Sequence, residues 1–298
     1  ILRQLADVYR KVRNTSRYLL GNLHDFNPAT DAIPIAELPL LDRWMLQRTA
    51  EVMDEITEAF ESFEFFRFFQ LLQNFCVTDL SNFYLDIAKD RLYVSAPQDQ
   101  RRRSCQTVMA LIIERLAGLI APVLCHMAED IWQNLPYPVE ETSVFHRGWP
   151  QVPAEWRDAT LSAPVQELRE LRAAVNKVLE DCRGRQELGA SLEAAVRIDA
   201  RRPELQTALS WLSERGNIEV DGLRDWLLVS QLQIGGEPWA EVLASQDDEL
   251  ASIEVSRARG TKCERCWHYE GDVGQNPEHP HICGRCVGVL ERRTHQLA

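Results

Sequence analysis

Apolar residues recur every three to four positions through the first half of the chain, which is the spacing of amphipathic helices. The predicted helices run from the N-terminus to about Leu23, from Leu41 to Phe60, from Phe65 to Phe83, and from Arg101 to Val123. Three prolines between His24 and Pro39 predict a loop after the first helix. Long helices with short connections form a bundle, so residues 1–150 are predicted to be a helical domain.

The pattern changes after a proline-rich connector, which is the clearest domain boundary in the chain. Its prolines are Pro136, Pro138, Pro150, Pro153 and Pro164. Beyond it, apolar residues from Leu161 to Leu179 predict one more amphipathic helix, and a short helix is expected around Leu205–Leu212. Alternating patterns predict strands at Ala195–Ile198, Trp226–Ile234 and Ile253–Val255. Residues 160–256 are therefore predicted to be a small α+β module.

Four cysteines near the C-terminus stand in two closely spaced pairs. Cys263 and Cys266 form the first C-x2-C pair, and Cys283 and Cys286 form the second after sixteen intervening residues. Each C-x2-C turn directs two thiolates to one side, and two such turns complete a tetrahedral zinc site. A tail of about 40 residues with few apolar side chains cannot fold on its own core, so the metal supplies folding energy. We predict one structural Zn²⁺ in a zinc knuckle formed by residues 257–298.

The pattern fits a structural zinc site better than disulfides, a mixed Cys/His site or a catalytic zinc. Disulfides are disfavoured because the remaining cysteines lie at or near helical core positions without paired spacing; these are Cys76, Cys105, Cys125 and Cys182. A histidine could replace one thiolate, and His268, His279 and His281 are near enough in sequence. A catalytic zinc needs an open position for water, which four protein ligands do not leave.

Charge is unevenly distributed along the chain. The formal net charge of −12 disfavours a protein that coats nucleic acid non-specifically. Residues 257–298 nevertheless carry seven Lys/Arg against five Asp/Glu. Basic and aromatic residues around the cysteines suit single-stranded RNA, because arginine binds phosphate and an aromatic ring stacks on an unpaired base. They are Arg259, Lys262, Arg265, Trp267, His268 and Arg285. The alternative is that Trp267 packs against the knuckle.

The first predicted helix carries a second basic stripe. Arg3, Arg10, Arg13 and Arg17 are separated by seven, three and four residues, so they share one face of the helix. A phosphate-binding face and an ordinary solvated face both fit this pattern.

Membrane insertion and secretion are not expected. The longest apolar run, Val108 to Leu124, is interrupted by Glu114 and Arg115, and no apolar leader follows a basic start. We predict a cytoplasmic protein without a membrane partner. Because residue 1 is Ile and no capping residue precedes the first helix, the chain is expected to be a fragment of a longer protein.

The chain resembles bacterial isoleucyl-tRNA synthetases in an ordered series of short motifs. The tail matches the zinc segment of that family with KCERCWHY at 262–269 and ICGRC at 282–286. The helical half matches its anticodon-binding bundle at 13–20, 22–23, 83–87, 89–91, 102–107, 121–122, 128–132, 143–145 and 149–150. The resemblance spans nearly the whole chain.

This resemblance implies a mainly α protein with a helical-bundle anticodon-binding domain, a small α+β module and a C-terminal zinc knuckle. It implies that the chain, as a monomer, binds tRNA at the anticodon stem-loop. The residues expected to contact tRNA are Arg13, Asn14, Arg17, Lys262, Arg265, Trp267, His268 and Arg285. The parent protein would be a class I aminoacyl-tRNA synthetase that joins isoleucine to its tRNA with ATP and Mg²⁺.

The chain lacks the sequence elements of that chemistry. No His-x-Gly-His or Lys-Met-Ser-Lys-Ser element is present in the sequence, so no catalytic residue is predicted and the chain alone should be inactive. ATP and Mg²⁺ would belong to a catalytic domain outside it. One departure from the family is Gln186–Leu188 ahead of Gly189–Ala194, where a basic and a β-branched residue are usual, so the resemblance does not carry an RNA role over to that turn.

Three alternatives stay open from the sequence. The chain could be the anticodon-binding part of a valyl- or leucyl-type synthetase, which shares the bundle. It could be a DNA-binding module, because DNA-repair glycosylases end in a similar finger, although their β-sandwich is not predicted here. It could also be a zinc-dependent interaction module without RNA.

Overall fold

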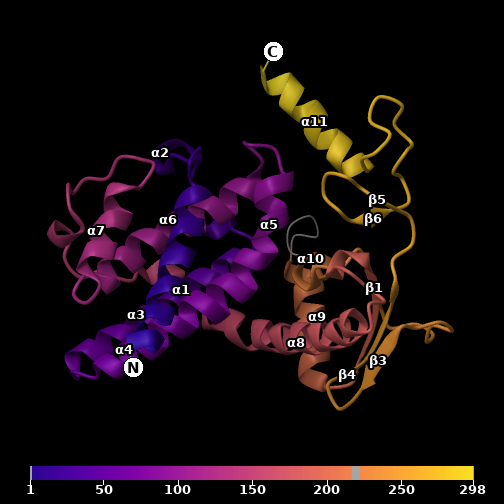
Figure 1. Ribbon diagram of the computed structural model, residues 1–298, viewed down its shortest axis with the longest axis horizontal. Helices are drawn as coiled ribbons and strands as arrows, with labels where there is room; N and C mark the ends of the chain where they lie inside the picture. The colour runs from indigo at the N-terminus through magenta and orange to yellow at the C-terminus, as the bar shows by residue number, and fades with distance from the viewer. Residues whose placement is uncertain (1, 217–221, 298) are drawn as a thin grey trace. The chain divides into compact units, whose positions relative to one another are not determined.

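The computed structural model describes residues 2–216 and 222–297, and within these ranges it describes the side chains of residues 6–292. The chain forms two compact units, Ile1–Ala159 and Thr160–Ala298 (Figure 1). None of the helices in the described ranges combines the length and apolar character that crossing a membrane requires.

Unit 1 is a helical bundle (Figure 1). Its segments are α1 (Leu2–Gly21), α2 (Pro28–Asp31), η1 (Ile35–Glu37), α3 (Leu40–Glu61), α4 (Phe65–Asn74), η2 (Phe75–Tyr84), α5 (Leu85–Val94), α6 (Gln100–Ile120), α7 (Cys125–Gln133), η3 (Val144–His146) and η4 (Ala154–Trp156). Helix α6 begins at a side-chain cap, because Asp99 accepts a hydrogen bond from the Arg101 amide. Helix α3 ends where Phe63 adopts a left-handed conformation (φ 59°).

The segments α4, η2 and α5 follow one another without a break, and the middle one is a π-helix. A π-helix makes i→i+5 hydrogen bonds and therefore has wider turns than an α-helix. Its buried residues come in adjacent pairs that repeat every four positions: Phe75–Cys76, Asp79–Leu80 and Phe83–Tyr84. The Ser81 hydroxyl donates a hydrogen bond to the Cys76 carbonyl, five residues earlier, at 2.7 Å. The outer side of this wide turn faces α1, where it forms part of a pocket described below.

A buried ion pair joins α3 to α5 inside unit 1. Asp42 and Arg91 are 0% and 2% exposed and form a two-pronged salt bridge. The Tyr84 hydroxyl donates a hydrogen bond to Asp42 at 2.6 Å, and Arg91 Nε donates one to the Arg101 carbonyl at 2.8 Å. The charge of Asp42 raises the pKa of Arg91, against the opposing effect of burial, so the guanidinium stays protonated. The core therefore holds a charged guanidinium whose partners are the Asp42 carboxylate oxygens and the Arg101 carbonyl.

Unit 2 contains a four-stranded sheet in the order β2-β1-β4-β3. After η5 (Ala159–Leu161), which spans the boundary between the units, its segments are α8 (Ser162–Gly184), η6 (Ser191–Glu193), β1 (Ala194–Ala200), α9 (Pro203–Arg215), α10 (Leu223–Leu227), β2 (Gln231–Ile234), β3 (Ala244–Asp247) and β4 (Ala251–Arg257), followed by β5 (Thr261–Lys262), β6 (Tyr269–Glu270) and α11 (Gly284–Leu297). Strands β1 and β2 are parallel, whereas β4 is antiparallel to both β1 and β3.

One face of this sheet forms the core of unit 2. Alternate residues of a strand point to opposite faces, and Val196, Ile198, Ile253 and Val255 pack with Val175 of α8 in one buried cluster. The opposite face is polar, and its centre holds a buried salt bridge between Arg197 and Glu254 (3.3 Å).

The predicted fold class is confirmed: the protein is mainly α, with a helical bundle, a small α+β module and a C-terminal cysteine cluster. The strand predicted at Trp226–Ile234 is wrong over its first half. Residues 223–227 form α10, which ends at the left-handed Leu228 (φ 55°), and only Gln231–Ile234 is a strand. Strand β3 and helix α11 were not predicted, because β3 has the polar sequence ASQD and α11 has no periodic apolar run of useful length.

Candidate metal centre and basic surfaces

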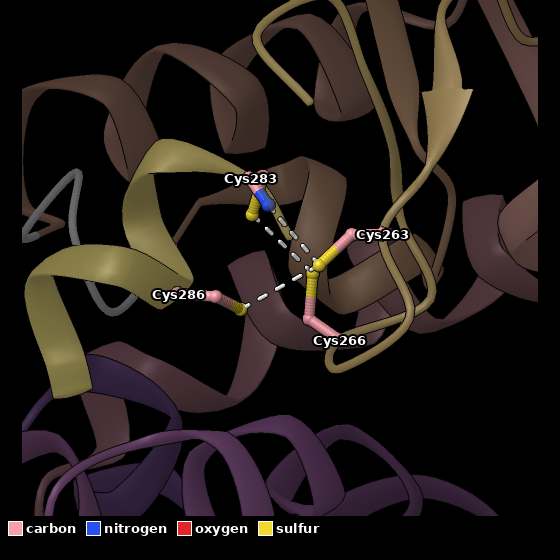
Figure 2. Close-up of side chains that lie close together, drawn as sticks. All are labelled: Cys263, Cys266, Cys283 and Cys286. Carbon is pink, nitrogen blue, oxygen red and sulfur yellow. Dashed lines mark hydrogen bonds between the residues drawn. The ribbon is translucent and has the colours of Figure 1, made fainter. Parts of the chain in front are cut away.

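The structure brings the four predicted cysteines together at one point, where Figure 2 shows their sulfur atoms turned toward one another. Cys263 follows β5, Cys266 lies in the turn after it, and Cys283 and Cys286 lie at the start of α11. All four are buried, and their sulfur atoms lie within 4.8 Å of one another.

The spacing of the sulfur atoms fits a tetrahedral zinc site. A tetrahedron of sulfurs each about 2.3 Å from a zinc ion has edges of about 3.8 Å. The Cys263 and Cys286 sulfurs are 3.8 Å apart, and those of Cys266 and Cys283 are 3.7 Å apart. A disulfide needs about 2.05 Å. The four sulfur atoms therefore match the donor set of a closed Cys₄ zinc site, and no histidine of the described residues belongs to the group.

Hydrogen bonds shape the turn that presents the first pair. The Cys263 amide donates to the His268 carbonyl at 2.8 Å, and the Trp267 amide donates to the Cys263 carbonyl at 2.9 Å. Around the sulfurs, the Cys283 amide donates to Cys263 Sγ at 3.3 Å and Arg265 donates to Cys286 Sγ at 3.6 Å. Such donors stabilise metal-bound thiolates.

The remaining cysteines are of a different kind. Burial raises the pKa of Cys76 to about 12 and that of Cys105 to about 11, so both stay protonated inside the bundle. Cys182 is also buried, whereas Cys125 is exposed at the start of α7.

The basic and aromatic residues around the cluster have different surroundings. Trp267 is 61% exposed, and the exposed Lys262 places its ammonium 5.9 Å from the centre of the indole ring. Arg265 is half-buried and contacts the cluster, and Arg285 is half-buried. His268 is 3% exposed, so its side chain cannot contact RNA without a rearrangement. Of the finger residues expected to contact tRNA, Lys262 and Trp267 are therefore the ones that are exposed.

Trp267 has an unusual backbone conformation, with φ at 68°. A non-glycine residue in this left-handed region costs roughly 1–2 kcal/mol. Glycine at this position would preserve the fold of the knuckle, because the hydrogen bonds of the turn involve only the backbone. A packing role for Trp267 is also disfavoured, because most of its side chain faces solvent.

Helix α1 presents the predicted basic stripe. Arg13, Asn14 and Arg17 are exposed, and neither arginine has a carboxylate partner among the described residues. Arg10 differs because it pairs with Asp7. Arg3 lies outside the described side chains.

A pocket of about 450 Å³ lies beside this stripe in unit 1. It is lined by Lys11, Asn14, Thr15, Tyr18, Val77, Ser81, Leu85 and Lys89. Thr15 and Ser81 are joined across it by a hydroxyl contact of 3.1 Å. Burial and a hydrogen bond with Tyr93 raise the pKa of Tyr18 far above its usual range, so its hydroxyl is neutral. The pocket thus offers neutral hydroxyls, an amide and the Lys11 ammonium to a ligand, whereas the Lys89 ammonium pairs with Asp86 at 2.8 Å.

Sequence reasoning found Asn14 but none of the other lining residues. The helical wheel shows how the two features join, since successive residues are 100° apart. Arg17 is about 60° from Asn14 on α1, and Tyr18 is about 40° from it on the other side. Asn14 therefore lies between the arginine stripe and the pocket.

Comparisons with known proteins agree with this architecture. A family model described as "Anticodon-binding domain of tRNA ligase" matches residues 42–198, and one described as "Zinc finger found in FPG and IleRS" matches residues 260–288. The chain is 88% identical over 297 residues to an isoleucine–tRNA ligase of Parasynechococcus marenigrum (strain WH8102), covering all of this chain. It is 78% identical over 293 residues to that of Synechococcus sp. (strain CC9311), and 75% identical over 293 residues to that of Prochlorococcus marinus (strain MIT 9313), covering 98% of this chain in each case. The chain spans 30% of the length of each of these relatives.

Proposed function

Because this chain belongs to the family of tRNA-ligase anticodon-binding domains, we propose that it forms the tRNA-reading C-terminal part of an isoleucine–tRNA ligase. The observation that carries this proposal is the pairing of an anticodon-binding match with an IleRS-type zinc finger in one chain. The relatives named isoleucine–tRNA ligase favour isoleucine over valine or leucine as the amino acid of the parent enzyme. The same pairing disfavours a DNA-binding module or a protein-interaction module.

The bundle is proposed to hold the anticodon arm of tRNA on α1. Arg13 and Arg17 are exposed cations without carboxylate partners in the described part of the chain, which is how phosphate-binding residues are presented. The adjacent pocket has a volume suited to a small ligand group such as one nucleobase, and Asn14 can both donate and accept hydrogen bonds there. An unpaired nucleotide could use both features at once, with its base in the pocket and its phosphate against Arg13 and Arg17.

The salt dependence of tRNA binding tests this arrangement. Replacing Arg13 or Arg17 by glutamine should weaken binding to every RNA about equally and reduce the salt slope by roughly one per lost contact. Arg10→Gln is the matched control, since Arg10 lies on the same helix but is paired with Asp7. Equal salt slopes for all three variants would contradict phosphate contact by the stripe.

The zinc finger is proposed to approach the anticodon loop with Trp267 and Lys262, and Cys263, Cys266, Cys283 and Cys286 are proposed as the zinc ligands. Bound zinc would hold the two turns together and supply no catalytic step. The residues of the chain then do the binding: Trp267 stacks on an unpaired base, and Lys262 contributes charge beside the ring.

Replacing Trp267 by glycine separates stacking from packing. Glycine adopts the left-handed conformation without strain, so the variant should keep its zinc at wild-type stoichiometry. Affinity for the anticodon stem-loop should fall about 5- to 150-fold, which corresponds to about 1–3 kcal/mol for one stacked base. An RNA with a fully paired stem in place of the loop should bind both proteins equally. Full zinc with unchanged stem-loop affinity would show that Trp267 does not contact RNA.

Aminoacylation is proposed to need the part of the ligase that this chain does not cover. ATP, Mg²⁺ and isoleucine would bind there, and Arg265, His268 and Arg285 would support the finger beneath the RNA surface. The 298-residue chain should therefore show no isoleucine-dependent exchange of pyrophosphate into ATP. Exchange above background, from protein free of host enzyme, would overturn this proposal.

Three further expectations belong to the same proposal. The finger, residues 257–298, should depend on metal for folding, whereas 1–150 and 160–256 should not. The chain should be a monomer, which sedimentation analysis can check. It should be cytoplasmic, where its tRNA partner is found.

A further inference from the structure

A cavity of about 620 Å³ lies on the polar face of the four-stranded sheet in unit 2. Its floor includes Ala195, Gln231 and Ser256, which are paired in register on β1, β2 and β4. Because alternate residues point to opposite faces, these three lie on the face opposite to the one where Val196 and Val255 join the buried core. Trp239, from the loop after β2, forms a wall of the cavity. The floor residues and Trp239 lie outside both the zinc finger, residues 257–298, and the bundle.

The rim of the cavity carries two arginines that differ from other arginines of unit 2. Arg257 and Arg259 are exposed and have no carboxylate partner among the described residues. Arg185 and Arg201 are also exposed, at 49% and 48%, but each pairs with an acidic side chain. The described lining contains one acid, Glu241, so the lining carries a net positive charge in a chain of net charge −12.

Hydrogen bonds hold the arginine rim in place. The Gln231 side chain makes two hydrogen bonds to the backbone of Arg259: it donates to the carbonyl at 2.8 Å and accepts from the amide at 3.0 Å. The Ala258 amide between the two arginines donates to the Glu193 carbonyl at 2.8 Å. The backbone of the rim is thus ordered before any ligand binds, which lowers the entropy lost on binding.

The aromatic wall is held in the same way. The Trp239 indole donates a hydrogen bond to the Gln233 side chain at 3.1 Å, and its amide donates to Glu254 at 2.9 Å. Glu254 is itself fixed by the buried Arg197, which also donates to the Gly236 carbonyl of the same loop. The buried ion pair therefore holds the loop over the sheet and sets the position of the ring.

A fixed aromatic ring beside two unpaired guanidinium groups is the combination that binds single-stranded nucleic acid. An acidic peptide would use the arginines but has no need of the ring. The two rim arginines are the first basic residues of the finger segment 257–298, and Arg259 is three residues before Lys262, so at most about 11 Å of extended chain separates them.

We propose that this cavity holds an unpaired nucleotide of the bound tRNA, with its phosphate between Arg257 and Arg259 and its base against Trp239. The inference rests on the proposed function and adds a contact site to it. The sheet module then acts as part of the RNA-binding surface, so one strand of RNA passes from the cavity to Lys262 and Trp267.

A pair of double variants of the full chain tests the role of the rim. Arg257→Gln with Arg259→Gln removes two proposed phosphate contacts, and Arg185→Gln with Arg201→Gln removes the same charge from paired arginines of the same unit. Binding of tRNA transcript is measured over a range of salt concentrations, with zinc content as the check on the finger. The first variant should lose about 1.4 from the salt slope, at about 0.7 per phosphate of a single strand, and the second should match the wild type.

The ring is tested with Trp239→Ala and Trp239→Phe. Alanine should lower the affinity for tRNA about 5- to 150-fold, and phenylalanine, which keeps a stacking surface, should restore most of it. A transcript annealed along its whole length to complementary DNA should bind the alanine variant and the wild type equally, because a paired base cannot enter the cavity. A poly-glutamate peptide should not compete with the RNA at equal charge concentration.

The outcomes separate this inference from the proposed function. If the wild type binds tRNA but both double variants keep its salt slope, the inference is wrong and the proposed function stands. Competition by poly-glutamate that is lost in the Arg257/Arg259 variant would also overturn it, since the site would then be one for acidic peptides. A wild type that binds tRNA no better than duplex DNA would overturn both.

Discussion

Replacing the buried Asp42 by asparagine, a change at one oxygen of its carboxylate, should strongly lower the stability of unit 1. Asp42→Asn keeps the shape of the side chain but removes the charge that faces Arg91, which is 2% exposed. The guanidinium would then lie in the core without a counter-ion, and breaking a buried pair in this way costs about 3–5 kcal/mol. The amide would also offer the Tyr84 hydroxyl and Arg91 a poorer acceptor than the carboxylate.

Hydrogen exchange followed by mass spectrometry measures this loss where it occurs. A loss of about 3–5 kcal/mol raises the opening equilibrium of unit 1 roughly 150- to 5,000-fold at neutral pH. Peptides from α3, α5 and α6 should therefore exchange faster by such a factor, whereas peptides from β1 and β4, in the other unit, should be unchanged.

Two further variants identify the cause. Asp54→Asn is the matched control on α3, because Asp54 pairs with Arg157 at the surface, where both side chains are about half exposed. Its effect on exchange should be at most about fivefold. Replacing the whole buried group, Asp42→Leu with Tyr84→Phe and Arg91→Met, should recover most of the lost protection. Unchanged exchange in α3 for Asp42→Asn would refute the reasoning.

Other predictions concern the metal, the pH dependence and one glycine. Cys283→Ser should lower the zinc content well below one per chain while the circular dichroism of the bundle stays largely intact, because the modules have separate cores. Burial raises the pKa of Asp25, but hydrogen bonds from Arg102 and Gln106 and the charges of nearby arginines outweigh it and lower the pKa to about 2. Asp25 therefore stabilises the fold above its ordinary pKa near 4, so the difference in unfolding free energy between wild type and Asp25→Asn should be constant from pH 7 to 5. It should shrink as the pH falls toward 2. Gly260→Ala should disrupt the β5–β6 pairing, because Gly260 has φ 99° and a Cβ there would lie 2.5 Å from the Glu270 carbonyl oxygen; faster exchange of peptides from the finger would show it.

The parts of the protein that the sequence predicted are those set by regular spacing. The two C-x2-C pairs predicted the four-sulfur cluster, because the geometry of such a turn depends on local chain length rather than on the rest of the fold. The long helices were predicted for a similar reason, since their apolar positions repeat over many turns.

The parts that were missed depend on contacts between distant segments. The pocket beside α1 requires Thr15 and Ser81 to meet across 66 residues, and the cavity on the sheet requires β1, β2 and β4 to pair in register. His268 is buried because the chain turns back after Cys266. Its polar side chain gave no sign of this burial in the sequence. The buried pairs in η2 repeat every four positions rather than every 3.6, but one of them contains the polar Asp79, so the repeat is visible in the burial and not in the apolar pattern of the sequence.

That π-helix has a consequence for how the family can vary. In an α-helix, removing one residue rotates everything beyond it by 100°, which would turn α5 and its buried Arg91 out of the core. A π-helical stretch carries a surplus residue, so a deletion within Phe75–Tyr84 can be absorbed by reverting to i→i+4 bonding while the flanking helices keep their orientation. Homologues one residue shorter here should thus retain the bundle but have a narrower wall opposite Thr15. Insertion or deletion of one residue in this segment would then widen or narrow the pocket while the rest of the bundle keeps its fold.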